Sequence, residues 1–208
     1  MNIILMGIQG SGKGTQAKLL SRKDNLHHID VGSLFRKHIK NKTKLGLNVK
    51  KYIDRGELVP DKYVLKMVSK TLDEYDGAFV LDGFPRNIVQ AKFLLKNYQI
   101  TRVIFLKLDD RIALKRLMAR RVCEDCKADY NILFKKPEKY GVCDKCGGKL
   151  VRRSDDNEKA IKKRLEKYHA ETKPLIKLFQ KKNLLITINA DKTIDKINNE
   201  IRTKLGLK

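Results

Sequence analysis

Short apolar runs alternate with amphipathic stretches along most of the chain. Five runs have the length and composition of buried strands, and they cover residues 2–6, 28–31, 78–81, 103–108 and 184–188. The segments between them carry helical patterns, and the last one places Ile194, Ile197, Ile201 and Leu205 on one stripe. Buried strands separated by helices form parallel sheets that are covered on both faces. We therefore predict an α/β fold with a five-stranded parallel sheet.

Two segments interrupt this alternation. Residues 32–76 contain three short helical patterns, broken at residues 42–46 and 56–61, which is more than a simple crossover needs. We expect this segment to include a helical insertion that binds substrate. Residues 122–155 have no helical period and contain every cysteine, so we expect a small excursion from the core.

The first predicted strand runs directly into a glycine-rich loop. Gly7, Gly12 and Lys13 have the spacing of a P-loop, whose backbone N–H groups and lysine surround a phosphate at the start of a helix. Gly14 occupies the position where most P-loops have Ser or Thr, and Thr15 follows one residue later. The pattern predicts a P-loop fold that binds a nucleoside triphosphate.

The cysteines form two CxxC pairs, Cys123 with Cys126 and Cys143 with Cys146. Four thiolates at this spacing complete a tetrahedral zinc shell and leave no position for a substrate, so the pattern indicates a structural zinc site. Iron could fill the same shell. Two disulfides or four free thiols are the alternatives without a metal.

The length and charge of the chain limit its class. The 208 residues fit one compact unit with outgrowths, and 47 basic against 24 acidic residues give a formal net charge of +23. The lysines are dispersed, which favours a solvated basic surface over a nucleic-acid site. No basic leader precedes the first strand, and the apolar runs are too short for a membrane helix, so we expect a cytoplasmic protein that binds no membrane.

Arginine is informative here because its planar guanidinium binds phosphate through two parallel hydrogen bonds. The arginines near candidate sites are Arg36, Arg86, Arg116, Arg120, Arg121, Arg152, Arg153 and Arg164. Asp82 ends an apolar strand, where an acidic residue would meet the magnesium of a P-loop nucleotide. Arg86 follows at the carboxyl edge of the sheet, where ligands of open α/β sheets bind.

Taken together, these motifs resemble those of adenylate kinases. The resemblance rests on the P-loop, residues 82–86 with Gln90, the pair Arg120 and Arg121, the tetracysteine insert, and Arg153 with Asp155 and Asp156; it spans residues 1–208. It implies a core of residues 1–30, 61–120 and 157–208, an AMP-binding insertion of residues 31–60 and a zinc-bearing lid of residues 121–156. It also implies a cis peptide bond between Phe84 and Pro85.

The resemblance implies reversible phosphoryl transfer from ATP to AMP, giving two ADP, by a monomer that uses magnesium with ATP. ATP would be bound by Gly10, Ser11, Gly12, Lys13, Gly14, Thr15, Arg116 and Arg120, with weaker contacts from Asp129, Tyr130 and Lys192. AMP would be bound by Val31, Arg36, Glu57, Leu58, Val59, Gly83, Phe84, Pro85, Arg86, Gln90, Arg153 and Arg164. The catalytic cations would be Lys13, Arg86, Arg120, Arg153 and Arg164, and Asp82 would hold magnesium through water.

The chain departs from the family pattern in two places. Gln9 stands where the family usually has Pro, and residues 31–33 read Val-Gly-Ser where the family has Thr-Gly-Asp. Val31 offers no hydroxyl to the acceptor nucleotide, so a kinase for another nucleoside monophosphate is the nearest alternative. A zinc-ribbon ATPase that binds nucleic acid and a noncatalytic nucleotide sensor are more distant ones.

Overall fold

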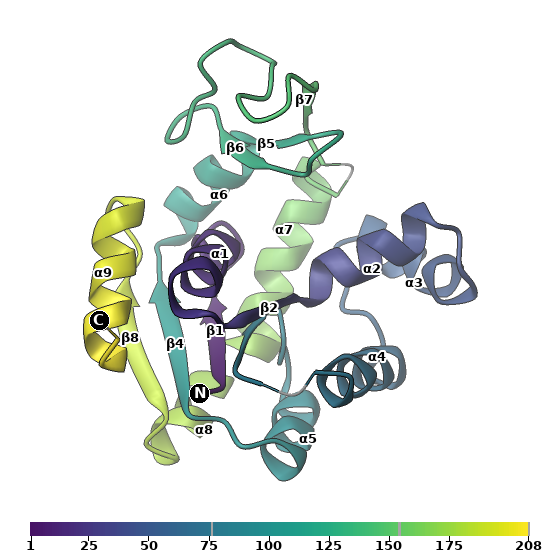
Figure 1. The fold of residues 1–208 in the computed structure, drawn as a ribbon. Coiled ribbons are helices and arrows are strands. Elements are labelled where there is room, and N and C mark those ends of the chain that lie inside the picture. The colour runs from purple at the N-terminus through teal and green to yellow at the C-terminus, as the bar shows by residue number, and fades with distance from the viewer. Residues whose placement is uncertain (76, 154, 208) are drawn as a thin grey trace.

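The protein is built around one parallel sheet. The computed structural model describes residues 1–75, 77–153 and 155–207, and its five-stranded sheet has the order β2-β3-β1-β4-β8 (Figure 1). All neighbouring strands in it are parallel. The strands are β1 (Ile3–Gly7), β2 (His27–Asp30), β3 (Phe79–Asp82), β4 (Arg102–Lys107) and β8 (Leu185–Asn189). The predicted fold class and all five predicted strands are confirmed, with ends that differ by one residue.

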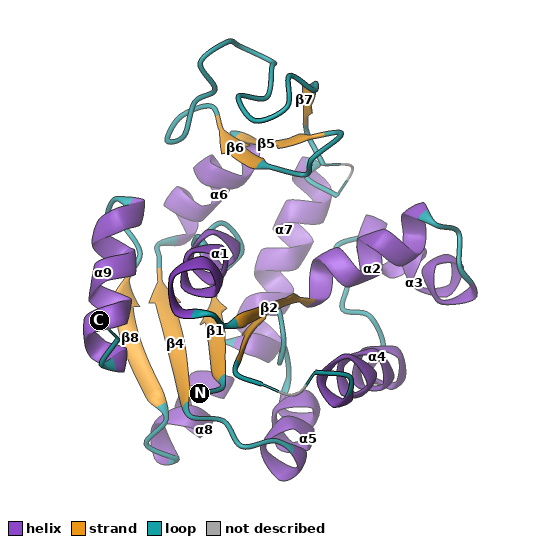
Figure 2. Ribbon diagram, viewed as in Figure 1, coloured by secondary structure: helices purple, strands orange, loops and turns teal. Residues whose placement is uncertain are grey.

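Helices cover both faces of this sheet (Figure 2). Side chains alternate between the faces along a strand. Ile3 and Leu5 of β1 therefore pack with α1 (Lys13–Asp24) and α9 (Ile194–Leu205). Ile4 and Met6 pack in a second cluster on the opposite face, which includes residues of α4 (Asp61–Asp73), α5 (Ile88–Asn97) and α8 (Leu175–Lys181). The two clusters hold β1 and β3 in place, and with them the carboxyl ends of these strands.

Three helices follow β2, as the sequence pattern predicts: α2 (Val31–Lys40), α3 (Lys44–Asp54) and α4. Two of the differences from the predicted boundaries have a clear local cause. Val31 was expected at the end of a strand but is the first residue of α2, because the Asp30 carboxylate accepts a hydrogen bond from the Ser33 N–H and caps the helix. Gly46 was expected in a break but lies inside α3, because Thr43 caps that helix from the preceding turn.

The excursion expected at residues 122–155 contains a small antiparallel sheet, of order β6-β5-β7, which the sequence pattern does not show. Its strands are β5 (Arg120–Cys123), β6 (Asp129–Asn131) and β7 (Leu150–Val151). Helices α6 (Asp110–Met118) and α7 (Glu158–Lys167) flank it in the chain, and Figure 1 shows it at their ends, at the top of the view. We call residues 120–153 the lid. After α7 the chain forms a π-helical turn at Tyr168–Thr172.

No helix within the described ranges has both the length and the apolar character needed to cross a membrane.

Candidate active site

A cleft of about 820 Å³ is bordered by the P-loop, the insertion helices and the lid. Its lining contains every predicted nucleotide-binding residue except Phe84 and Pro85. Those two line a small adjoining pocket that shares Lys13 and Arg86 with the cleft, and their peptide bond is cis, as the resemblance implies. The fold therefore brings the predicted residues together, whereas the nucleotide that each one contacts stays a prediction.

The P-loop turns sharply at Gly12, the residue before α1, which has φ +93°. Directly after it, the Lys13 ammonium donates hydrogen bonds to the carbonyl oxygens of Gly7 (2.8 Å) and Ile8 (3.0 Å). Burial lowers the pKa of Lys13 to about 8, with Asp82 opposing the shift and Arg86 and Arg120 adding to it. The loop thus holds a partly buried cation that a polyphosphate would stabilise.

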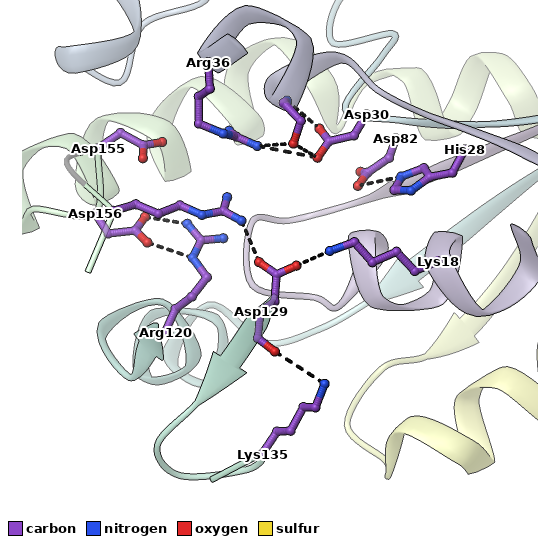
Figure 3. A network of polar contacts seen from close by, with 12 residues as sticks. Lys18, His28, Asp30, Arg36, Asp82, Arg120, Asp129, Lys135, Asp155 and Asp156 are labelled. Carbon is purple, nitrogen blue, oxygen red and sulfur yellow. Dashed lines mark hydrogen bonds and ion pairs between the residues drawn. The ribbon is translucent and has the colours of Figure 1, made fainter. Parts of the chain in front are cut away.

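The strand-terminal carboxylate of Asp82 lies against the P-loop helix. A Cβ atom at position 14 would stand 3.1 Å from Asp82 Oδ2, so a larger residue in place of Gly14 would crowd this carboxylate. On the other side, His28 Nε2 lies 3.8 Å from the same carboxylate (Figure 3). Carboxylate oxygen is the ligand type that Mg²⁺ prefers, so the position of Asp82 fits the predicted magnesium contact.

The side chain of Arg36, in α2, is held by residues at the start of the same helix. Its guanidinium donates to Ser33 Oγ (2.7 Å) and lies 3.5 Å from Asp30 Oδ2 (Figure 3). Burial raises the pKa of Asp30, but Arg36 and the hydrogen bonds from Ser33 more than reverse this effect, so the pKa lies below its ordinary value. The residues that replace the family's Thr-Gly-Asp run therefore still orient the arginine.

Asp156 holds two of the predicted catalytic arginines. Arg120 binds both of its carboxylate oxygens, at 2.7 and 2.5 Å, and Arg164 donates to one of them at 2.7 Å. Arg164 also contacts Asp155 at 3.1 Å. Asp156 is only 1% exposed; burial raises its pKa, but the two arginines reverse this and bring it below the ordinary value. The site analysis missed this role, although Asp155 and Asp156 belong to the motif on which the resemblance rests.

Arg86 and Arg153 add further positive charge around the cleft. Burial lowers the pKa of Arg86, and the nearby charges of Arg164 and Arg36 contribute to the lowering. Burial also lowers the pKa of Arg153, with repulsion from Arg120 and Arg36 adding to it. The fold holds these cations around one cleft, where they repel one another. A ligand with several negative charges relieves this repulsion, so the cleft favours such a ligand.

Arg116 and Phe134 form a cation–aromatic pair in the lining of the cleft. Arg116 donates to the Ala190 carbonyl (3.0 Å), and its guanidinium lies 5.3 Å from the ring centroid of Phe134. Phe134 is 59% exposed and lines the cleft, as does Lys192. An arginine plane beside an exposed ring can stack on a nucleotide base. The sequence analysis missed Phe134, whose only signal was an aromatic residue within the cysteine insert.

Tyr130, a predicted ATP contact, is directed mainly into the lid. Its hydroxyl lies 3.5 Å from Cys143 Sγ and accepts a hydrogen bond from the Asp144 N–H (2.9 Å). The residue borders the cleft, but its side chain is only 5% exposed. Its hydrogen bond lowers the pKa of Cys143 to about 6, which favours the thiolate form that binds metals.

The four cysteine sulfurs lie within 4.8 Å of one another. The Sγ atoms of Cys123 and Cys146 are 3.4 Å apart and those of Cys126 and Cys143 are 3.6 Å apart. A disulfide requires about 2.05 Å, so the two-disulfide alternative is wrong. A tetrahedral shell with bonds of about 2.3 Å would separate its sulfurs by about 3.8 Å. The cluster fits such a shell and could bind zinc.

Comparisons with known proteins agree with this geometry. The family model described as "Adenylate kinase" matches residues 5–184. The chain is 42% identical over 214 residues to an adenylate kinase of Caldicellulosiruptor bescii, with all of both chains covered. It is 44% identical over 213 residues to an adenylate kinase of a Geobacillus species and 43% identical to one of Clostridium tetani, with 99% of each chain covered in both cases.

Proposed function

Because this chain belongs to the adenylate kinase family, we propose that it transfers the terminal phosphoryl group of ATP to AMP and reversibly forms two ADP. The observation that carries the proposal is the gathering of Lys13 and the guanidinium groups around one cleft; these are Arg36, Arg86, Arg116, Arg120, Arg153 and Arg164. Both substrates are phosphate anions. A single cleft of this charge suits two nucleotides that meet phosphate to phosphate.

In this proposal, ATP occupies the side of the cleft formed by the P-loop and the lid. Residues 10–15 surround its phosphates with backbone N–H groups. The Lys13 ammonium uses two of its three N–H groups on loop carbonyls, which leaves one for the transferred phosphate. The adenine stacks beside Arg116 and Phe134, with Lys192 at the same end of the cleft.

AMP occupies the side formed by the insertion, where Arg36 and Arg86 bind its phosphate and Gln90 faces its base. The backbone of residues 57–59 and 83–86, together with Val31, frames the nucleotide. Arg86 is well suited to this role because it is anchored twice. Its Nε donates to the Gly83 carbonyl (2.8 Å), and its own carbonyl accepts from Thr172 Oγ1 (2.7 Å).

The chemistry asks the protein to align two phosphates and to stabilise charge, because the transition state of phosphoryl transfer is loose. The attacking oxygen of AMP is already ionised at neutral pH, so no general base is needed. Lys13, Arg86, Arg120, Arg153 and Arg164 stabilise the equatorial oxygens of the transferred group. Asp156 pre-orients Arg120 and Arg164 for this task, so little reorganisation is required when the substrates bind.

Water is the competing acceptor, and the lid must exclude it. The two metals have separate parts in this proposal. Asp82 would hold through water the magnesium that accompanies ATP, and this ion would supply charge neutralisation on the donor phosphates. The four cysteines would hold zinc, which would keep the lid folded and take no part in the reaction.

Free thiols clustered at a metal site suit a reducing compartment, so we propose that the protein is cytoplasmic. We also propose that it is a monomer.

The experiment is a coupled assay of ADP formation from ATP with AMP, GMP, CMP and UMP compared side by side. We expect AMP to give the highest kcat/KM. Val31 favours a second candidate, a kinase with a broader choice of acceptor, because it is 3% exposed, lines the cleft and offers no hydroxyl. A monophosphate other than AMP as the best acceptor would replace the first proposal by the second. ATP hydrolysis that depends on added RNA or DNA would reject both.

A further inference from the structure

The side chain of Gln90 is held in one orientation by groups on both of its ends. Its Oε1 accepts a hydrogen bond from the Arg86 backbone N–H (2.7 Å), and its Nε2 donates to Asp61 Oδ1 (2.8 Å). A backbone N–H can only donate, and an ionised carboxylate can only accept. Turning the amide over would set N–H against N–H and oxygen against oxygen, so the positions of Oε1 and Nε2 are determined.

Asp61 is itself fixed in place. It is the first residue of α4, and its Oδ1 also accepts a hydrogen bond from Asn87 Nδ2 (2.9 Å). The Asn87 side chain in turn caps α5 by accepting from the Gln90 N–H (2.9 Å). The carboxylate therefore joins the beginnings of α4 and α5 and reaches the Gln90 amide from outside the helix that carries it.

After these bonds, the Gln90 amide retains one N–H and one oxygen lone pair in the plane of the group. Gln90 is 1% exposed but borders the cleft, so a ligand in the cleft is the available partner. Adenine offers a donor at N6 and an acceptor at N1. A 6-oxopurine offers an acceptor at O6 and a donor at N1, which is the reverse order. An amide of fixed orientation can pair with only one of them in a given pose.

We propose that Asp61 is a positioning residue for acceptor specificity, which selects 6-aminopurine over 6-oxopurine monophosphates by preventing the Gln90 amide from turning over. This inference rests on the proposed function, in which Gln90 faces the acceptor base. Asp61 does not contact the nucleotide in this account. It acts through Gln90, and its removal changes the choice between acceptors more than it changes the rate with the better one.

The test compares AMP with IMP, which share ribose, phosphate and ring size and differ at the base edge that the amide would read. In Asp61→Ala, Gln90 loses one of its two restraints, and we expect the ratio of kcat/KM for AMP over IMP to fall about 3- to 10-fold. The effect should lie mainly in KM. Asp61→Asn keeps an oxygen acceptor at the same position and should restore the ratio to within about twofold of the wild-type value.

Asp73→Ala is the matched control. Asp73 is the last residue of the same helix, and its carboxylate also accepts a hydrogen bond, from the Tyr98 hydroxyl (2.8 Å). This variant should leave the AMP-to-IMP ratio unchanged. If Asp61→Ala melts below the assay temperature, the AMP-to-IMP ratio of every variant is measured at a lower temperature at which Asp61→Ala is folded.

The inference is overturned if Asp61→Ala keeps the wild-type ratio, or if Asp61→Asn loses it as fully as Asp61→Ala does. Gln90→Ala separates this failure from failure of the proposed acceptor site. If Gln90→Ala abolishes the discrimination while Asp61→Ala leaves it intact, only the positioning role of Asp61 is rejected. If Gln90→Ala also leaves the discrimination between AMP and IMP intact, Gln90 does not contact the acceptor base. The proposed role of Gln90 and the positioning role of Asp61 are then both rejected.

Discussion

Lys18 of α1 and Asp129 of β6 form an ion pair that joins the P-loop helix to the lid (Figure 3). The second oxygen of Asp129 accepts from Arg153 at 2.7 Å. Burial raises the pKa of Asp129, but Lys18 and Arg153 reverse this and bring it below the ordinary value. One carboxylate thus contacts both the core and a cation predicted to act in catalysis, so the position of the lid and that of Arg153 are coupled.

This pair should bias the lid toward its contact with α1, but only weakly. The side chains of Lys18 and Asp129 are 43% and 32% exposed, and ion pairs of this exposure contribute about 0–1 kcal/mol. We expect Lys18→Gln to speed amide hydrogen exchange in residues 120–131 of the nucleotide-free protein by about 1.5- to 5-fold. Lys23→Gln, at an exposed position on the same helix, is the control. Unchanged exchange in Lys18→Gln would show that the pair does not hold the lid.

Arg86 should be sensitive even to a substitution that keeps its charge. Lysine cannot donate to the Gly83 carbonyl and to two phosphate oxygens in the fixed geometry of a guanidinium. We expect Arg86→Lys to lower turnover by about 10²- to 10³-fold, the scale of losing one preorganised charge contact, without lowering the melting temperature. Arg102→Lys, an exposed change on β4, should leave turnover at the wild-type value. Near-normal turnover in Arg86→Lys would remove Arg86 from the site.

The pKa of Lys13 predicts a pH dependence of ATP affinity. Burial places this pKa at about 8, and a bound triphosphate stabilises the charged form and so raises it. Below that pH, Lys13 is charged in both the free and the bound protein, and affinity is highest. Above it, the free protein must take up a proton when ATP binds, so affinity falls by up to about tenfold per pH unit.

Calorimetry with a nonhydrolysable ATP analogue checks this dependence between about pH 7 and about pH 9.5, above the range in which phosphate itself titrates near pH 6. Two buffers of different ionisation enthalpy should reveal proton uptake near the upper end of the range. Lys13→Met should bind weakly and show neither effect. Affinity that stays flat across the range would mean that Lys13 does not meet the triphosphate.

The cysteine cluster predicts that metal removal affects one part of the molecule. The apolar cluster around these cysteines is small, comprising Cys123, Tyr130, Cys143 and Leu150 with Ala128 beside them. A bound zinc at such a site contributes roughly 10–16 kcal/mol of apparent free energy, so its removal should unfold residues 121–156. Hydrogen exchange should rise there and not in the five-stranded sheet, ATP should still bind the P-loop, and added zinc should restore protection. Protein that is purified without chelator and contains no metal would contradict the assignment.

Features encoded locally could be predicted from the sequence, and features that depend on packing could not. The five strands and the P-loop each occupy a short continuous stretch, and the paired spacing of the cysteines predicted their cluster. In contrast, Asp156 joins Arg120 of β5, in the lid, to Arg164 of α7, in the core. The ion pair of Lys18 with Asp129 joins residues 111 positions apart. The pattern of apolar and polar positions along the sequence carries no information about ion pairs between residues so far apart.

The misplaced end of β2 is a different kind of error, because its signal was present. Asp30 precedes Val31 by one residue and Ser33 by three, which is the spacing of a helix cap. The apolar character of Val31 outweighed that signal and extended the predicted strand by one residue. Asp61 shows the opposite case. It is recognisable as an acidic residue in the first turn of a helix, but only the fold brings it to the side chain of Gln90.

The most direct test of the central claim is the mass balance of the reaction, followed by chromatography of the nucleotides. Mixed with ATP, AMP and magnesium, the protein should consume the two substrates in equal amounts and form two ADP for each pair, and it should form ATP and AMP when given ADP alone. Without AMP, ATP should be stable. Loss of ATP to phosphate at a rate independent of AMP would show that water is the acceptor, and it would contradict the account.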